Sequence, residues 1–535
     1  MLLLLVDGSS GESMESWDVI VIGSGIAALR SAIAASDAGA TVSVIGTNGP
    51  GSGQSMTGST GLAASIAEAD HIAHVENTAS AGLGLTNSVV VEQRCSLATS
   101  HLIELERWGL NLQRNGSGSP YSAKAPGHTS PRLCCAGDST GREIVRILEE
   151  QCMKRGIPRK HDLQVISICN ESERIRGVVV LDIQTGVIAP IQGKAVILAT
   201  DDHSGLWNDE GGSGLGSSLA LRAGAKLSGM EFVSWYPFCV PTSNYRLPIS
   251  LIDAGARLRT SNGDDVEITG SMTEISISLM EETHVLDARS VPKSQRGWFT
   301  TTEQILVSRF GIDIWTDVVP IEPQPDYAIG GVVVDDQGRA LLSSNLWLTG
   351  LYATGGSSNS GMHGADTISG NRLLDDLIGG SNSGSSAAKW IGTVGFGGRD
   401  ALDELAMISE NHIETLSRSE SGNTVGATIA SLRRLMNSDM GLERKASSMS
   451  SCATKIEEMV QADIHLSDES FVMNTELIRA LELQGMLALA RTIVSAAEAR
   501  EETRGSHRRT DYPEMNEKHS NALIVDAEGA ITTLN

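Results

Sequence analysis

The stretch WDVIVIGSGIAALRSAIAASDAGATVSVIGT, residues 17–47, restricts the fold more than any other part of the sequence. Its order is an apolar run, a glycine turn, an alanine-rich helical segment and a second apolar run, which predicts a β-α-β unit. Gly23 permits the tight turn, Gly25 lets the backbone approach a pyrophosphate, and Ala28 replaces the third glycine where helix and strand meet. We therefore expect an α/β fold with a Rossmann-like domain and a dinucleotide phosphate at the helix N-terminus.

The end of the second apolar run departs from the usual dinucleotide pattern. This run ends Ile45-Gly46-Thr47, without the acidic residue that normally binds a ribose hydroxyl. The departure argues against a simple NAD enzyme with a standard ribose clamp.

Three later segments extend the prediction. Residues 48–65, NGPGSGQSMTGSTGLAAS, form a Gly/Ser/Thr loop that either offers N–H and hydroxyl groups to an isoalloxazine ring or phosphate, or is a flexible linker. GKAVILATDD (193–202) and GLYATGG (350–356) each read as a buried strand that ends in a turn. Their separation indicates a dinucleotide domain that is interrupted by an inserted domain.

The amino-acid composition limits which binding partners and cellular locations we expect for this chain. The chain has 41 basic and 65 acidic residues, a formal charge of −24, which repels nucleic acid. Its seven cysteines are scattered without a CxxC motif, so we expect reduced thiols, no metal site and no internal iron–sulfur cluster. The N-terminal MLLLLV is too short to span a membrane and reads as an extension before the first strand. We expect a cytoplasmic location, or one peripheral to a membrane complex, with no direct membrane span.

Several motifs together resemble one family, the flavoprotein subunit of succinate dehydrogenase and fumarate reductase, which also includes aspartate oxidase. The resemblance covers residues 17 to about 515. Besides the β-α-β stretch it is carried by PRLCCAGDSTGREIVRILEEQC (131–152), LALRAGAKLSGMEFVSWYP (219–237), DYAIGGVVVDDQG (326–338), MHGADTISGNRLLDDL (362–377) and the tail 473–513.

The resemblance implies a domain organisation. A Rossmann-like FAD-binding domain would occupy 17–240 and 325–395, interrupted by a capping domain at 241–324 and followed by a helical C-terminal domain and tail at 396–535. Periodicity supports the last part independently, because an apolar stripe on a long helix is traced by Leu477, Leu481, Leu483, Met486 and Leu489.

The resemblance also implies FAD as the cofactor. Membrane-complex members of the family hold the flavin covalently through a histidine, and the alignment places Gln54 at that position. An amide cannot form this bond, so we expect non-covalent FAD. The expected cofactor-binding residues are Gly23, Ser24, Gly25, Ala27, Ala28, Gln54, Ser55, Gly61, Thr200, Asn371 and Leu373.

Other cofactor positions depart from the family pattern. A glycine pair is replaced by Asp201-Asp202, a ribose-binding acid by Leu215, a glutamate by Gly356 and a serine by Arg372. A cation at residue 372 would stabilise a reduced, anionic flavin.

The residues at the family's substrate-binding positions all differ from the family pattern in the same way: positive or proton-donating groups are lost. Family members clamp a dicarboxylate with two arginines and two histidines, because a guanidinium binds a carboxylate through two hydrogen bonds. Here Tyr236 and Asp326 stand at the two histidine positions, and Thr273 and Thr367 stand at the two arginine positions. Pro248-Ile249 occupies the place of an expected Thr-Glu pair, so all of these positions are neutral or acidic. We therefore expect a diverged dicarboxylate site with an altered substrate.

Three hypotheses follow. The chain is an FAD-dependent oxidoreductase that acts on a neutral or cationic small molecule, or through Arg257, Arg259 and Arg372. Alternatively, it is a catalytically inactive member with a structural or partner-binding role, or a working succinate or fumarate enzyme whose site is assembled differently. The candidate catalytic residues are Tyr236, Arg257, His363 and Arg372. An iron–sulfur subunit or another acceptor protein would take the electrons.

Overall fold

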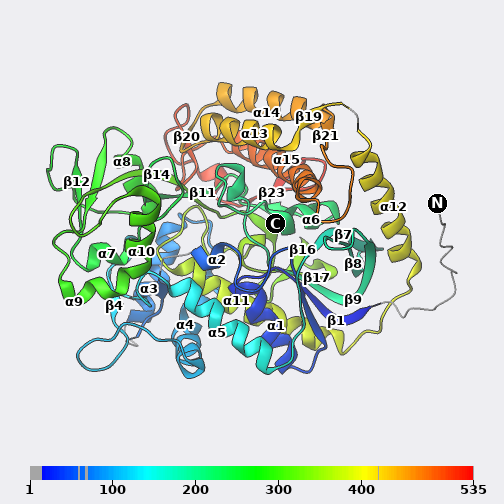
Figure 1. Cartoon of the computed structure of the whole chain (residues 1–535), viewed down its shortest axis with the longest axis horizontal. Coiled ribbons are helices and arrows are strands. Elements are labelled where there is room, and N and C mark those ends of the chain that lie inside the picture. The colour runs from blue at the N-terminus through cyan, green and yellow to red at the C-terminus, as the bar shows by residue number, and fades with distance from the viewer. Residues whose placement is uncertain (1–14, 58–60, 67–69, 420, 534–535) are drawn as a thin grey trace.

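The computed structural model describes residues 15–57, 61–66, 70–419 and 421–533 (Figure 1). The apolar run at 1–6 and loop positions 58–60, on which two of the expectations above fall, lie outside these ranges. Within them, no helix is both long and apolar enough to cross a membrane. All seven cysteines are buried free thiols.

An eight-stranded sheet forms the centre of the molecule, and its order is β16-β17-β8-β9-β1-β2-β6, with β7 paired to β8. β1 and β2 run parallel in the register Val19 with Val42, which confirms the predicted β-α-β unit. β9 and β17 continue the parallel part, so their carboxyl ends lie beside that of β1. The strands are β1 (Ser16–Ile22), β2 (Val42–Ile45), β6 (Arg159–Lys160), β7 (Leu163–Glu171), β8 (Arg174–Asp182), β9 (Ile188–Leu198), β16 (Arg339–Ser343) and β17 (Leu346–Ala353).

Helix α1 (Ile26–Asp37) packs against the long helix α11 (Asn371–Ile391), as Figure 1 shows. Glycines on α11 make this close approach possible, because a Cβ at Gly384 would lie 2.1 Å from the carbonyl oxygen of Ser31. At the start of α1 the contact is made by Gly380, where a Cβ would lie 2.6 Å from the carbonyl oxygen of Ala27. Helices α2 (Gln54–Thr57), α3 (Asp70–Ala81), α4 (Ser88–Trp108) and α5 (Thr140–Lys154) complete this side.

A second, antiparallel sheet has the order β11-β14-β13-β12 and lies at the left of Figure 1. It encloses a separate apolar core that includes Phe238, Leu258, Leu286 and Phe299. Its elements are β11 (Val233–Cys239), α7 (Ser250–Asp253), β12 (Arg257–Thr260), α8 (Met272–Ser278), β13 (His284–Asp287), α9 (Lys293–Arg296), α10 (Thr300–Ile305) and β14 (Val319–Ala328).

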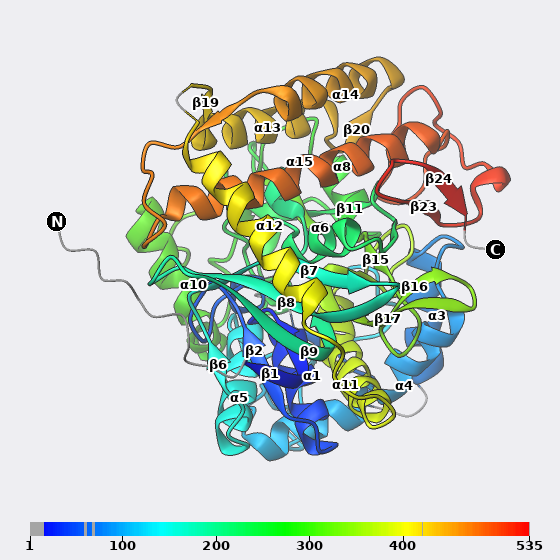
Figure 2. The same ribbon diagram turned by 90° about the vertical axis from the view of Figure 1, so that its right-hand side faces the viewer.

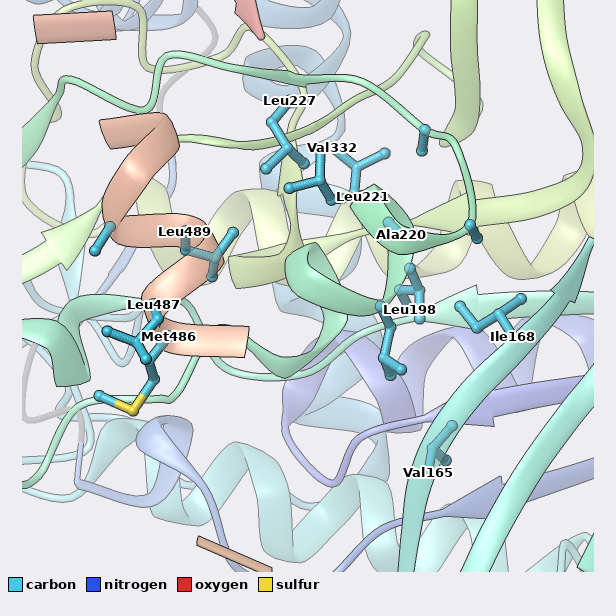
Figure 3. Close-up of a cluster of buried hydrophobic side chains, with 14 of the residues drawn as sticks. Val165, Ile168, Leu198, Ala220, Leu221, Leu227, Val332, Met486, Leu487 and Leu489 are labelled. Atoms are coloured by element: carbon cyan, nitrogen blue, oxygen red, sulfur yellow. The ribbon is translucent and has the colours of Figure 1, made fainter. Parts of the chain in front are cut away.

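The C-terminal helices cover the other side of the central sheet. Helix α12 (Asp400–Ser417) lies across β7, β8 and β9, and α15 (Thr475–Ala499) packs against α14 (Ala446–Gln461) and α6 (Leu215–Arg222) (Figure 2). Figure 3 shows Met486, Leu487 and Leu489 of α15 in the core that also holds Leu198 and Ala220. The predicted apolar stripe is thus a packing face, although Leu481 is only partly buried.

The remaining elements are short, apart from helix α13. A five-stranded sheet joins β10 (Leu227–Ser228), β15 (Gly331–Val333), β18 (Ser358–Asn359), β23 (Leu523–Val525) and β24 (Ile531–Thr533). The others are β3 (Leu62–Ala63), β4 (Ser122–Ala123), β5 (Leu133–Cys134), β19 (Asn423–Thr424), α13 (Val425–Asp439), β20 (Glu443–Arg444), β21 (Ile464–His465) and β22 (Arg508–Arg509).

Candidate cofactor and substrate site

The candidate site lies where the parallel strands β1 and β9 end. Gly23 follows β1 with a φ of +136°, and a Cβ at this position would lie 2.1 Å from the carbonyl oxygen of Ala199. Only glycine allows this turn to pass so close to the end of β9. The turn directs the first N–H groups of α1 toward the strand ends.

A cleft of about 530 Å³ opens at this point, which we call the strand-end cleft. Gly23, Ser24 and Thr200 line it, together with Thr47 after β2 and Arg433 of α13. Helix N-termini and hydroxyl groups favour phosphate, and the volume falls within the range of about 300–1,000 Å³ that ligand pockets occupy. The lining also includes four carboxyl groups that oppose a phosphate, so the cleft has the size and the hydrogen-bond donors for a nucleotide but not a uniformly favourable charge. They belong to Asp162, Asp201, Asp209 and Glu482.

The serine-rich loop lies directly on the start of α1. The Oγ of Ser55 accepts a hydrogen bond from the Ile26 N–H at 3.4 Å. The Ser24 hydroxyl donates to the Ser52 carbonyl oxygen at 3.4 Å, and the Ser52 hydroxyl donates to Ser24 Oγ at 3.0 Å. Three hydroxyl groups thus gather at the end of the helix where a phosphate would bind.

Beside the cleft, four residues form what we call the buried polar cluster: Gln54, Asp202, Ser204 and Arg372. Gln54 Nε2 donates to Asp202 Oδ1 at 3.2 Å and to Ser204 Oγ at 2.9 Å. Arg372 Nη2 donates to Gln54 Oε1 at 2.7 Å and lies 3.4 Å from Asp202 Oδ2. Asp202 is fully buried, so its charge is balanced inside the protein by Arg372.

Further contacts hold Arg372 in place. Its guanidinium carbon lies 4.4 Å from the centre of the Tyr327 ring, a cation–π arrangement. Burial alone would lower the pKa of this guanidinium, but Asp202, Asp376 and Asp326 raise it above its usual value. These three carboxyl groups therefore favour the charged form of Arg372.

A second, much smaller space of about 60 Å³ lies on the other side of the buried polar cluster, and we call it the inner cavity. It holds room for only a few water molecules. The side chains that line it come from strands β11 and β14 of the second sheet, from helices α2, α8 and α11, and from the segment after β11. They include Gln54, Tyr236, Arg246, Met272, Asp326, Tyr327, Arg372, Leu373 and Asp376. Among these lining residues the only cations are Arg246 and Arg372.

Arg246 is a site residue that the sequence analysis did not find. Its Nε lies 2.7 Å from Asp326 Oδ1, and its Nη2 donates to the Asp326 carbonyl oxygen at 3.3 Å. Asp326, which replaces a family histidine, thus pairs with Arg246. Only the position of Arg246 shortly after the WYP motif could have pointed to it.

Two buried carboxyl groups have raised pKa values. Burial raises the pKa of Asp376, in the wall of the inner cavity, to about 7, although Arg372 acts in the opposite direction. Burial likewise raises the pKa of Asp366 to about 6, although the Thr367 N–H and the Thr273 hydroxyl, 3.1 Å away, lower it. Asp366 lines a neighbouring cleft of about 610 Å³ that it shares with Thr273 and Arg504.

The structure brings together only part of the predicted catalytic set. Tyr236 and Arg372 line the inner cavity, but the Tyr236 hydroxyl donates to the Leu247 carbonyl oxygen at 2.5 Å. His363 is buried behind the cavity wall, with Nδ1 3.1 Å from Thr367 Oγ1. Arg257 lies away from the cavity on β12, exposed and paired with Asp265 at 2.9 Å.

The predicted cofactor-binding residues are also found in different places in the structure. Gly23, Ser24 and Thr200 line the strand-end cleft, whereas Gln54, Ser55 and Leu373 line the inner cavity. The Asn371 side chain is engaged within the protein by His74 and Thr78, at 2.8 Å each. At Gly61 a Cβ would lie 2.5 Å from Cys135 Sγ, which identifies a packing constraint. Gly25, Ala27 and Ala28 form the start of α1 as expected from the motif.

Comparison with known proteins identifies the class of this fold. Residues 18–373 match the model of the FAD binding domain, and residues 429–530 match that of the fumarate reductase flavoprotein C-terminal region. The succinate dehydrogenase flavoprotein subunit of Rickettsia felis is 26% identical over 560 residues, which cover 96% of this chain and 93% of the relative. An uncharacterised FAD-dependent oxidoreductase of Methanocaldococcus jannaschii is 27% identical, with 95% and 96% covered.

Solved structures agree with this. FrdA of E. coli quinol fumarate reductase superposes with a TM-score of 0.90 at 23% identity, covering 97% of this chain and 96% of that one. The Mycobacterium smegmatis Sdh1 complex in its apo form gives 0.82 at 26% identity, with 97% and 94% covered. The chain belongs to the family of FAD-dependent flavoprotein subunits of succinate dehydrogenase and fumarate reductase.

FAD is the cofactor of this family. The two halves of FAD differ in how well the spaces in this structure accommodate them. The strand-end cleft has the volume, the helix N-terminus and the hydroxyl groups that an adenosine diphosphate moiety requires. The inner cavity, at about 60 Å³, is far below the size of a site for a three-ring flavin. The flavin ring therefore does not fit the arrangement of Gln54, Asp202 and Arg372 described above.

Proposed function

We propose that this chain is an FAD-dependent oxidoreductase whose substrate is a small neutral or cationic molecule rather than a dicarboxylate. One observation carries the proposal: each arginine in the wall of the inner cavity already has a carboxylate partner. Arg246 pairs with Asp326, and Arg372 pairs with Asp202.

Electrostatics explains why this pairing excludes a dicarboxylate. To bind one, Arg246 would have to share its guanidinium between the ligand and Asp326, which places carboxylates of like charge side by side. Separating Arg246 from Asp326 would instead leave a partly buried carboxylate, 22% exposed, without its cation. The cost is unfavourable but below the about 3–5 kcal/mol that is typical of breaking a fully buried pair. A neutral or cationic ligand leaves both pairs intact.

The chain's own residues have distinct roles under this proposal. Tyr236, Tyr327 and Met272, the first residue of α8, provide apolar surface for the substrate. Asp376 gives or takes the proton, because a carboxyl with a pKa of about 7 exchanges protons readily at neutral pH. The Tyr236 hydroxyl orients the cavity wall through its bond to Leu247.

Binding of labelled succinate by equilibrium dialysis tests the proposal without requiring turnover. We expect no binding to the native chain, and measurable binding to Asp326→Asn, which frees the Arg246 guanidinium. Asp265→Asn is the matched control, because it frees Arg257 away from the cavity while Arg259 keeps its pair with Asp287, and it should leave succinate binding undetectable. Tight succinate binding by the native chain would contradict the proposal.

A second candidate function is a structural or partner-binding role without catalysis. The small volume of the inner cavity favours it. A colourless preparation that takes up no added FAD would support this role, whereas FAD uptake with a flavin spectrum supports the oxidoreductase.

We also propose a cytoplasmic chain that passes electrons to a second protein, such as an iron–sulfur subunit. The relatives support this, because their names describe flavoprotein subunits. Co-purification of the native chain with a coloured iron–sulfur protein would support the proposal. Isolation of the chain alone under the same conditions would contradict it.

A further inference from the structure

A cleft of about 610 Å³ lies next to the inner cavity, and we call it the outer cleft. Thr273 of α8 lines the outer cleft, and the preceding Met272 lines the inner cavity. In the same way Asp366 lines the outer cleft and Thr367 lines the inner cavity. Helix α3 and the tail segment 503–515 contribute the other walls. Its volume falls within the range of about 300–1,000 Å³ that ligand pockets occupy.

The wall beside α8 carries two carboxyl groups. Asp366 is buried, and its Oδ1 accepts hydrogen bonds from the Thr273 hydroxyl at 3.1 Å and from the Thr367 N–H at 2.9 Å. Burial raises the pKa of Asp366 to about 6, and the carboxylate of the exposed Glu274 also raises it. Glu274 itself accepts from the Ser271 N–H at 2.7 Å. Neither carboxylate forms an ion pair with a basic side chain that the structure describes, so this wall favours a cation.

The tail contributes two arginines to the outer cleft, and they differ in their partners. Arg504 is held by Glu502, with Nε donating to Oε1 at 2.7 Å and Nη2 donating to Oε2 at 2.9 Å. Arg508 makes no ion pair with a described residue, and its buried Nε has no hydrogen-bond partner among them. Glu514, a third carboxyl in the lining, is exposed, so solvent screens its charge. Arg508 is therefore a guanidinium that can accept a carboxylate.

We propose that the outer cleft binds a small zwitterion, with the carboxylate on Arg508 and the ammonium group on Asp366. A dianion would meet the carboxylates of Asp366 and Glu274, and a dication would leave Arg508 without a partner. A molecule with one charge of each sign satisfies both walls, and amino acids with uncharged side chains belong to this class. The site lies outside the inner cavity, so the proposal does not depend on which substrate that cavity accepts.

Calorimetry on the full chain tests the proposal with glycine, β-alanine, γ-aminobutyrate and ε-aminocaproate, which differ in the separation of their charges. Measurements at about pH 8 keep Asp366 ionised. Each zwitterion is compared with the carboxylate and the amine of the same chain length, which carry a single charge. We expect at least one zwitterion to bind at least about tenfold more tightly than both of its single-charge analogues, because it alone reaches both walls.

Two variants assign the binding to the outer cleft. Arg508→Gln should weaken the binding of this zwitterion by at least about tenfold, and Asp366→Asn by at least about threefold, since Glu274 remains. Arg399→Gln is the matched control, because Arg399 is exposed and lines neither space, and it should leave the dissociation constant unchanged. If Arg508→Gln does not fold, the comparison of zwitterions with their analogues on the native chain still decides the matter.

Two results would overturn the proposal. One is a native chain that binds none of the zwitterions more tightly than their single-charge analogues, and the other is zwitterion binding that Arg508→Gln leaves unchanged. Either leaves the proposed substrate class untouched, because succinate dialysis with Asp326→Asn reports on Arg246 in the inner cavity.

Discussion

At the scale of single residues, two opposing effects act on the pKa of Asp376. Burial raises its pKa to about 7, and the nearby Arg372 guanidinium acts in the opposite direction. A carboxyl of this kind is protonated in the folded protein at a pH where the unfolded chain has already released its proton. The folded state therefore binds one more proton between pH 3.8 and about 7, and stability falls as the pH rises through that window.

The variant Asp376→Asn removes this dependence. Below pH 3.8 the two proteins should be equally affected, and the advantage of the variant should grow up to about pH 7 and then level off. At about 1.4 kcal/mol per pKa unit the gain is at most roughly 4 kcal/mol. Thermal unfolding of both proteins across this pH range measures it, and a difference that does not change with pH would contradict the assignment.

Gln54 carries a second prediction at this scale. A carboxamide has no nucleophilic ring nitrogen, so any flavin bound to the chain should be released by acid. After acid precipitation of the FAD-loaded protein, we expect the flavin in the supernatant. Flavin retained in the precipitate would show a covalent bond and contradict the role assigned to Gln54.

The residues of the buried polar cluster illustrate what a sequence alone can reveal. Each departure from the family pattern, at Gln54, Asp202 and Arg372, was visible by itself. Their mutual bonding was not, because Gln54 and Arg372 are 318 positions apart and no local periodicity links them. Arg246 was not predicted as a site residue for the same reason, because its place in the site is evident only from its contact with Asp326.

At the scale of elements, helix α1, which follows the Gly23 turn, packs against helix α11, whose first turn includes Arg372. Gly384 faces the backbone of Ser31, and a methyl group there would lie 2.1 Å from a carbonyl oxygen. Helices that pack this closely cannot accept added volume without moving apart.

Gly384→Ala should therefore lower the free energy of unfolding by about 1–3 kcal/mol, as measured by denaturant titration. Gly426→Ala is the matched control, because Gly426 lies in helix α13 with open space around it. There alanine should raise stability by up to about 1 kcal/mol through its better helix propensity. Equal losses in both variants would contradict the packing argument.

The elements near the site were the more predictable part of the fold. The β1–α1–β2 unit followed from residues within one short segment, where turn glycines and apolar runs act locally. The α15 stripe likewise followed from helical spacing. The exposed position of Arg257 on β12 could not be predicted from the sequence, because the exposure of a strand residue depends on how the whole sheet packs.

At the scale of the whole molecule, charge and shape act together on the substrate. The chain carries a formal charge of −24, and the two arginines of the inner cavity are each paired with a carboxylate. A dianion is thus opposed by the overall field and finds no unpaired cation in the wall of this cavity. The fold matches that of E. coli FrdA, and both arginines in the wall of the inner cavity are paired with carboxylates, which supports the proposed substrate class.

Anaerobic titration of the FAD-loaded chain with succinate tests this central claim most directly. We predict that flavin absorbance stays unchanged with succinate, that dithionite bleaches it, and that fumarate does not restore the colour of the reduced protein. Bleaching by succinate, or reoxidation by fumarate, would contradict the account.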